Sequence, residues 1–358
     1  MSKARELANL GNAYSDGALS NRNLIINGAM QVAQRGTSKT ATSAATYLLD
    51  RFMAYAGDYV NYGYTVSQTT DAPTGFSNSL KYNFDVVDTS PATEHSLYYR
   101  FEGQDLQRLK KGTASAESVT LSFWVKASLA GTYIVELMDN DNSNRHINKS
   151  YSISSANTWE YKTITFAGDT TGTITNDNST SIDITFWLAA NSSNTSGTLQ
   201  TSWGALNQAN RAVGQTNLGA TANNAFYITG VQLEVGDTAT PFEHRSYGDE
   251  LARCQRYYYE LGNQNYYPYG LGTGMSSTLA RPILKHPVSM RTAPSLSVTN
   301  LSNIVIEANI LTGLSIDIMT RENAMLNANV SGGIASRDCV RMYDFGSGTS
   351  KIHFDAEL

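Results

Sequence analysis

Residues 226–236 read Phe-Tyr-Ile-Thr-Gly-Val-Gln-Leu-Glu-Val-Gly, and they predict a long β-strand whose inward-facing parity changes partway along. The apolar residues up to Ile228 share one parity, and those from Val231 onward share the other. Side chains alternate strictly along a strand, so this step requires one extra residue. Gly230 stands at the step, where a glycine indicates a β-bulge. A bulged strand of this kind is typical of the wall of a sandwich or barrel.

Alternating strand patterns continue on the N-terminal side of this segment. Polar clusters such as 71–75 and 139–142 separate them and predict turns. Many short alternating strands without helical patterns between them indicate an antiparallel sandwich or jelly roll. The clearest series of alternating apolar residues are 80–86, 97–101, 119–125, 164–166 and 182–188.

Several short motifs, in their order and spacing, resemble the carbohydrate-binding-module-like jelly-roll domain of many bacteriophage tail-fibre proteins. Besides 226–236, the resemblance rests on four segments, which are Asn-Arg-Asn-Leu-Ile-Ile-Asn-Gly-Ala-Met at 21–30, Leu-Asp-Arg-Phe at 49–52, Val-Thr-Leu-Ser-Phe-Trp-Val-Lys at 119–126 and Thr-Pro-Phe-Glu at 240–243. In that family a segment similar to Glu-Leu-Ala-Arg-Cys-Gln-Arg-Tyr-Tyr at 250–258 links the jelly roll to a smaller C-terminal β-domain. The resemblance therefore covers residues 21 to about 260.

We expect three parts: an N-terminal anchoring helix and linker at 1–20, a jelly roll at 21–247, and a short helix with a smaller β-domain at 248–358. Near-helical spacing of apolar residues predicts the first helix. It is too short to be stable alone in water, so it needs a packing partner. The candidates for docking on the virion or for trimer contacts are Ala4, Leu7, Ala8 and Leu10. Within 248–358 we expect a helix at 248–256, a loop at 270–274, and strands at 280–288, 295–298, 303–307, 314–319 and 351–358.

The composition limits the classes of partner. Charged residues make up 16 % of the 358 residues and the net charge is −5, with no Lys/Arg run longer than two. Nucleic acid needs clustered basic side chains, so it is not an expected partner. No segment approaches the ~20 apolar residues of a membrane helix, and the N-terminus has no apolar signal core. We expect a protein that is made in the host cytoplasm and located on the virion surface.

Catalytic and metal-binding patterns are weak. Paired carboxylates could hydrolyse a glycoside, but sequence alone cannot bring any two of the candidates together. A calcium-binding loop that begins at residue 139 would need Gly at its sixth position and Glu at its twelfth, where the sequence has Asn144 and Ser150. We interpret 139–144 as a hairpin turn. The five histidines lack zinc spacing. We expect no enzyme activity, no metal and no cofactor. The acidic residues considered were Glu94, Glu102, Asp105, Glu136, Asp139 and Glu234.

Aromatic residues give the strongest binding signal. Six tyrosines fall within residues 257–269. Tyrosine offers a flat apolar face and a hydroxyl, which suits stacking on sugar rings. The alternative is packing between domains or between copies of the chain, which we favour for 257–259. The glycan-contacting candidates are Tyr266, Tyr267, Tyr269 and, as a loop tryptophan, Trp203.

The resemblance implies a phage tail fibre or spike that binds host-surface receptors, expected to be glycans, as a homotrimer attached to other virion proteins through its N-terminus. A head fibre or decoration protein of the same fold, attached to the capsid, is an alternative. A polysaccharide depolymerase and a cellular carbohydrate-binding module are further alternatives. Release of sugar would distinguish the enzyme from the binder, and labelling in intact particles would distinguish tail from head.

Overall fold

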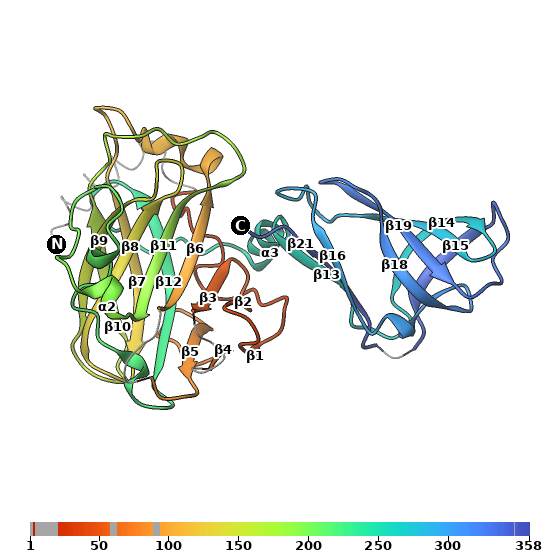
Figure 1. The fold of residues 1–358 in the computed structure, drawn as a ribbon, viewed down its shortest axis with the longest axis horizontal. Coiled ribbons are helices and arrows are strands. Elements are labelled where there is room, and N and C mark those ends of the chain that lie inside the picture. The colour runs from red at the N-terminus through yellow and green to blue at the C-terminus, as the bar shows by residue number, and fades with distance from the viewer. Residues whose placement is uncertain (1–2, 4–20, 58–62, 89–93, 347) are drawn as a thin grey trace. The chain divides into compact units, whose positions relative to one another are not determined.

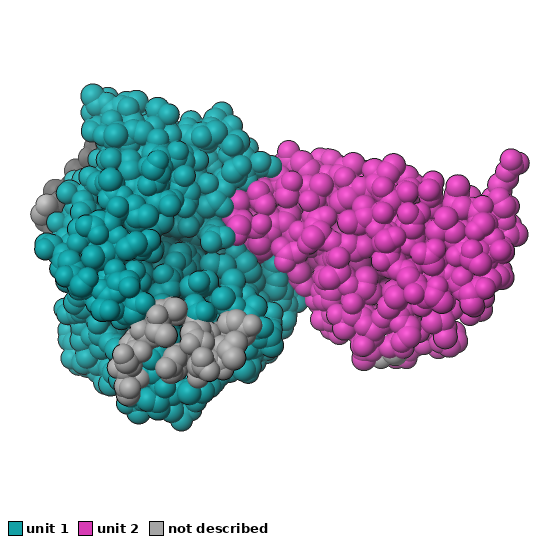
Figure 2. Space-filling model, in the orientation of Figure 1, with its two compact units in different colours: residues 1–247 teal, residues 248–358 magenta. Residues whose placement is uncertain are grey.

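The computed structural model describes residues 3, 21–57, 63–88, 94–346 and 348–358. The chain divides into two compact units, Met1–Tyr247 and Gly248–Leu358 (Figure 2). Both are built from antiparallel strands, as the sequence predicts. In the described ranges, no helix has the length and apolar character needed to cross a membrane. The residues of the predicted N-terminal helix, Ala4, Leu7, Ala8 and Leu10, lie outside the described part of the chain.

The first unit is a jelly-roll-like sandwich of two six-stranded sheets (Figure 1). One sheet has the order β1 (Ser38–Thr40), β4 (Tyr64–Thr69), β5 (Ser79–Phe84), β12 (Ala225–Val235), β7 (Val119–Ala127) and β10 (Glu160–Phe166). The other has the order β2 (Ala45–Tyr47), β3 (Phe52–Ala56), β6 (His95–Glu102), β11 (Thr180–Ala189), β8 (Gly131–Asp139) and β9 (Arg145–Ile153). The connections contain η1 (Gly103–Leu109), α2 (Ser192–Thr195), η2 (Gln208–Asn210) and η3 (Leu218–Ala220).

The core lies between the two sheets. Phe123 of β7 and Phe186 of β11 meet across it with ring centroids 5.2 Å apart. Both side chains are buried, like their apolar neighbours of the same parity along each strand. The alternating patterns at 119–125 and 182–188 therefore form the two inner faces. The predicted hairpin at 139–144 is confirmed, since these residues connect β8 to β9.

Strand β12 contains the predicted bulge. Its register against β7 shifts between Thr229 and Gln232. Gly230 has φ +61°, and a Cβ there would lie 2.7 Å from the Phe76 ring. Both the backbone conformation and the close ring require glycine. The bulge lets the apolar side chains on both sides of it face the same core.

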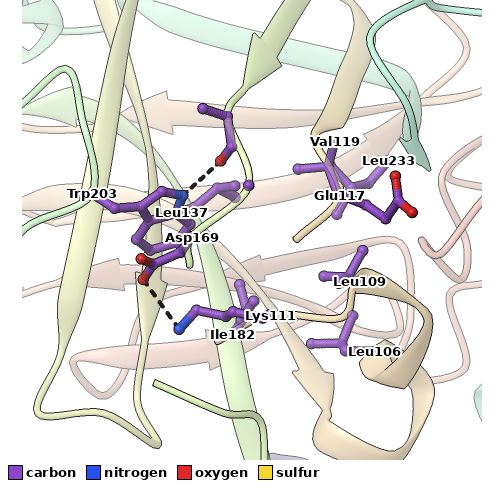
Figure 3. A pocket seen from close by; sticks show the side chains of 12 residues that line it. Leu106, Leu109, Lys111, Glu117, Val119, Leu137, Asp169, Ile182, Trp203 and Leu233 are labelled. Carbon is purple, nitrogen blue, oxygen red and sulfur yellow. Dashed lines mark hydrogen bonds and ion pairs between the residues drawn. The ribbon is translucent and has the colours of Figure 1, made fainter. Parts of the chain in front are cut away.

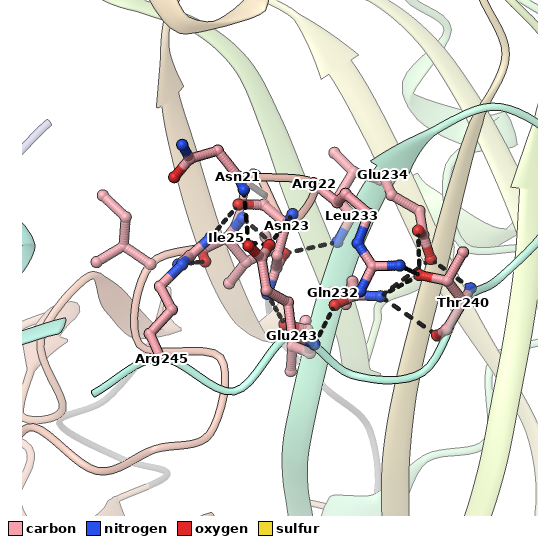
Figure 4. Close-up of polar contacts among 12 residues, drawn as sticks. Asn21, Arg22, Asn23, Ile25, Gln232, Leu233, Glu234, Thr240, Glu243 and Arg245 are labelled. Atoms are coloured by element: carbon pink, nitrogen blue, oxygen red, sulfur yellow. Dashed lines mark hydrogen bonds and ion pairs between the residues drawn. The ribbon is translucent and has the colours of Figure 1, made fainter. Parts of the chain in front are cut away.

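The opening segment of the sandwich is fastened to the end of β12 by a polar cluster (Figure 4). The Asn23 amide donates to the carbonyl of Val231 at 3.1 Å and accepts from the amide of Leu233 at 3.1 Å. The Glu243 carboxylate accepts from the backbone amides of Asn21 and Asn23, both at 2.7 Å. The motifs at 21–30, 226–236 and 240–243 therefore meet in space and close the sandwich. This contact gives a physical reason for their joint occurrence.

The second unit begins with the predicted helix, α3 (Tyr247–Gln255). A three-stranded sheet follows, with the order β13 (Tyr258–Gly262), β21 (Lys351–Asp355) and β16 (Ser295–Thr299). The remaining strands form a closed barrel in the order β14 (Pro268–Ser276), β15 (Leu279–Lys285), β19 (Asn323–Val330), β18 (Asn309–Met319), β17 (Ile304–Ile306) and β20 (Cys339–Asp344), with η4 (Leu301–Asn303) before β17.

The prediction of a loop at 270–274 is wrong, because these residues lie inside β14. Its glycines remove the apolar alternation by which a strand is recognised, yet they permit close packing. A Cβ on Gly272 would lie 2.3 Å from the carbonyl oxygen of Arg281 on β15. Strands β13, β19 and β20 were also not predicted. Close contact between strands, rather than hydrophobic pattern, accounts for β14.

Candidate functional site

Trp203, one of the predicted glycan contacts, is half-buried at one end of the sandwich. Its indole N–H donates to the Ala167 carbonyl at 2.7 Å, and its ring packs 5.6 Å from Nζ of Lys111 (Figure 3). These groups line a void of about 20 Å³, which is enough for about one water molecule. Trp203 therefore closes the core rather than offering an open face for a sugar.

Lys111 beside this void lies in a buried ionic cluster. Its ammonium pairs with Asp139 and, at 3.2 Å, with Asp169, and it donates to the carbonyls of Thr171 and Gly172, both at 2.9 Å. Burial opposes ionisation of Asp169, but the neighbouring Arg145 and Lys111 outweigh it and lower the pKa of this carboxyl. The two carboxylates at this corner of the sandwich are thus neutralised internally by Lys111 and Arg145.

The predicted tyrosines occupy three different environments. Tyr266 is 65 % exposed. Tyr267 is half-buried against the core of the second unit. Tyr269 is only 6 % exposed, and its hydroxyl donates to the Ser350 carbonyl at 2.9 Å. Tyr269 is therefore a core residue, which removes it from the surface candidates. Tyr257, Tyr258 and Tyr259 are also buried.

Tyr266 borders an open hollow on the barrel surface of about 430 Å³. Its backbone is left-handed, with φ +57°. Opposite it, Arg341 lies 5.6 Å from the Tyr343 ring and pairs with Glu307 at 3.0 Å. The hollow offers aromatic and aliphatic surface, while its arginine already has a partner. It is lined by Tyr266, Pro268, Gly270, Leu271, Arg341, Met342 and Tyr343.

A more polar cleft, which the sequence did not predict, lies on the outer face of the sheet that contains β6, β11 and β8. Its volume is about 420 Å³. Strand pairing places Asp183 of β11 beside Arg100 of β6 and Met138 of β8, and places Thr185 between Tyr98 and Glu136. We call it the sheet-face cleft, and it is lined by Ala45, Met53, Tyr55, Glu94, Tyr98, Arg100, Met138, Asn144, Asp183, Leu206, Gln208 and Arg211.

One wall of the sheet-face cleft is held by an ionic network. Arg211, from the connection after α2, donates to both carboxylate oxygens of Glu136, at 2.7 Å from Nη2 and 3.0 Å from Nε. His146 Nδ1 lies 3.0 Å from the same carboxylate, and Arg211 stacks 4.9 Å from the Trp187 ring. Burial alone would raise the pKa of Glu136, but His146 and Arg211 outweigh it and lower the pKa. Glu136 is thus a fixed anion that positions the wall.

Asp183 of β11 lines the sheet-face cleft. Burial raises the pKa of Asp183 to about 6, against the opposing effects of Arg100 and of a hydrogen bond from Asn140. The Arg100 guanidinium approaches Oδ2 only to 3.7 Å. Oδ1 has no hydrogen-bond partner among the residues that the structure describes. A buried carboxylate oxygen without a hydrogen-bond partner is rare in folded proteins, and here it belongs to a residue that lines a cleft.

Glu94 and Tyr98 also line the cleft, beside Arg211. The Tyr98 hydroxyl donates to Oε1 of Glu94, and the Ser96 hydroxyl donates to the same oxygen at 3.0 Å. Oε2 of Glu94 lies 3.9 Å from Arg211. Of the acidic residues weighed from sequence, Glu94 and Glu136 are thus brought together around one arginine. Asp139 instead pairs with Lys111, and Glu234 accepts from the hydroxyl of Thr240.

The sequence does contain a signal for this cleft. Asp183 stands between Ile182 and Ile184, and Glu136 stands between Val135 and Leu137. An acid on the outward parity of a strongly apolar strand is expected to be solvated. Here both acids are buried because the connection after α2 covers part of that face. The sequence shows the outward parity of both acids, but it does not show that the connection after α2 covers them.

No protein-family model matches the sequence, and no curated protein is matched. Among solved structures, the active domain of bacteriophage CBA120 tailspike protein 4 is similar with TM-score 0.32 and 12 % identity, over 60 % of this chain and 21 % of that one. A CBM4 structure is similar with TM-score 0.31 and 13 % identity, over 58 % of this chain and 97 % of that one. The tandem CBM22 domain of Paenibacillus barcinonensis Xyn10C is similar with TM-score 0.31 and 10 % identity, over 93 % of this chain and 95 % of that one. At such low scores these likenesses carry no functional inference.

Proposed function

We propose that the chain is a structural protein of a phage particle, a tail fibre or spike, which binds a host-surface glycan in the sheet-face cleft. The observation that carries this proposal is Asp183, a residue of the cleft lining whose buried Oδ1 has no hydrogen-bond partner among the described residues. Sugar hydroxyls and amides are donors that suit such an oxygen. Rigid strands hold the surrounding Tyr98, Arg100 and Tyr55, so little order is lost when a ligand binds.

Tyr266 supplies a second, weaker contact in this proposal. Its exposed ring suits stacking on a sugar, but the hollow beside it contains no comparable unpartnered polar group among the described residues. Assembly as a homotrimer would present several clefts to one surface, which raises the effective concentration of each. Residues 1–20 are the proposed attachment to other virion proteins, of the tail or, in the alternative, of the capsid.

The cleft supports binding better than hydrolysis. A general acid with the raised pKa of Asp183 would suit a glycosidase, but the second carboxylate must be available to water or to the sugar. Glu136 is engaged by Arg211 and His146, and Oε1 of Glu94 accepts from Tyr98 and Ser96. We therefore propose that the chain is not an enzyme, and a depolymerase remains the alternative to be tested.

A glycan array probed with the full chain tests the proposal. We expect binding to a subset of bacterial surface oligosaccharides, with loss of about tenfold or more in affinity for Asp183→Asn, because one charged hydrogen bond is removed. The matched control is Asp338→Asn, an exposed aspartate on the barrel. Equal binding by both variants would contradict the assignment of the cleft. Release of reducing ends that depends on Asp183 would favour the depolymerase.

A further inference from the structure

The outer face of the sheet that forms the sheet-face cleft carries more acidic than basic side chains. His146 adds no positive charge, because its Nε2 accepts from the backbone amide of Asn207 at 3.4 Å and its Nδ1 faces the carboxylate of Glu136. The buried cluster around Lys111 is balanced within itself. The described acids of this face are Glu94, Glu102, Glu136 and Asp183, and the described bases on it or at its edge are Arg51, Arg100 and Arg211.

Asp183 has a cation on one side only. Strand pairing places Arg100 of β6 on one side of it and Met138 of β8 on the other. The next residue of the same parity along β11, Thr185, is neutral. The Arg100 guanidinium lies 3.7 Å from Oδ2, which is longer than a hydrogen bond, and Oδ1 has no partner among the described residues. The side chain of Asp183 is only 8 % exposed, so water screens its charge poorly.

The surroundings of Asp183 do not fully offset its charge. A buried carboxylate is costly unless a cation compensates it. Burial raises the pKa of Asp183 to about 6, although Arg100 and a hydrogen bond from Asn140 act in the opposite direction. A neutral hydroxyl or amide supplies a hydrogen bond to a carboxylate, whereas an ammonium group supplies both a hydrogen bond and the missing charge. A cationic group of a ligand therefore gains more at Asp183 than a neutral donor does.

We propose that the sheet-face cleft selects glycans that carry a free amino group, whose ammonium pairs with Asp183. The proposal rests on the proposed function and narrows its ligand to an amino sugar that is not N-acetylated. Arg100 occupies the β6 side of Asp183, so the ammonium lies on the β8 side, next to Met138. Met53, Met138 and Tyr55 line the same cleft and offer apolar surface to the sugar ring.

Other ligand classes fit this face less well. An acidic sugar would bring a further negative charge to a face on which the described acids already outnumber the bases. Ca²⁺ takes about six or more oxygen ligands, and in the described part of the chain no group of three or more His, Cys, Asp and Glu side chains is placed to hold a metal ion. An N-acetylated amino sugar keeps the same nitrogen without its charge, which makes it the matched comparison for the ammonium.

Two copies of one array of bacterial oligosaccharides test the proposal, one untreated and one treated with acetic anhydride in water, which converts the amines to acetamides. We expect the full chain to bind amine-bearing sugars of the untreated copy, and to bind their acetylated counterparts at least about tenfold more weakly. Asp183→Asn should lose this preference, because its amide carries no charge, and bind both copies equally weakly. Asp338→Asn, at an exposed position of the barrel, should keep the preference. Tryptophan fluorescence checks that both variants are folded.

The outcomes separate the amine preference from the proposed function. Equal or stronger binding of the wild type to the acetylated copy would overturn the amine preference while leaving glycan binding in place. A preference for amines that persists in folded Asp183→Asn would locate the ammonium elsewhere and would overturn the assignment to Asp183. A wild-type chain that binds neither copy would overturn both the amine preference and the proposed function.

Discussion

The sandwich and the barrel differ in where they keep their apolar side chains. In the described part of the first unit, which contains the sandwich, the exposed large apolar residues are Val86, Val87, Tyr161 and Tyr247. The smaller second unit exposes more of them, namely Tyr266, Leu271, Met275, Ile283, Ile310, Ile316, Ile318 and Phe345. The sandwich instead buries charged groups, around Lys111 and around Arg211. The comparison suggests that polar recognition belongs to the sandwich.

The largest expected effect tests the buried charges of the sandwich. Lys111→Met leaves Asp139 and Asp169 without their shared ammonium, and removal of one partner of a buried pair costs about 3–5 kcal/mol. All four tryptophans lie in the sandwich, so urea unfolding followed by tryptophan fluorescence reports on that unit alone. The control is Lys110→Met, because Lys110 forms an exposed pair with Glu117. Similar midpoints for the two variants would show that the buried cluster does not stabilise the sandwich.

The next effect tests the two faces of the barrel with neighbouring residues of β15. Leu284 is buried and Ile283 is exposed. Leu284→Ala should cost about 2–5 kcal/mol, because it leaves a cavity. Ile283→Ala should change the stability of the barrel by no more than about 0.5 kcal/mol. Calorimetry of the barrel transition checks this difference, and an equal cost at both positions would mean that Ile283 is covered within the chain.

A smaller effect tests the sheet-face cleft, and here the substitution is expected to raise the stability rather than lower it. Because burial raises the pKa of Asp183 to about 6, the folded wild type binds this proton more tightly than the unfolded chain. Its contribution to stability is fully present below about pH 4 and is lost as the pH rises through about 6. Asp183→Asn removes this dependence and should be about 3 kcal/mol more stable than the wild type at pH 8. Unfolding followed by tryptophan fluorescence at pH 4 and pH 8 checks it. A constant difference between the two proteins would contradict the assigned pKa.

The sandwich was predictable because its determinants are local. The parity step at Gly230 specified a bulge, and alternation at 119–125 and 182–188 specified inner faces. The barrel was less predictable, because β14 contains three glycines among its first seven residues and shows no alternation. Its strand character depends on close pairing with β15 and β20, which no local pattern encodes.

The candidate site was predictable only in part. Exposure of Tyr266 follows the sequence interpretation, whereas Tyr269 and Trp203 find partners that are distant in sequence, at Ser350 and Ala167. The sheet-face cleft combines Glu94, Asp183 and Arg211, which are separated by long stretches of chain. Sequence reasoning can assign the strand parity of Asp183 but cannot foresee that the connection after α2, with Arg211, folds over the same face.

The most direct test of the central claim is a crystal structure of the full chain with the oligosaccharide selected on the array. The account predicts sugar density in the sheet-face cleft, with a hydroxyl, amide or ammonium group of the sugar donating to Oδ1 of Asp183. Density on the Tyr266 surface of the barrel, with an empty cleft, would contradict it.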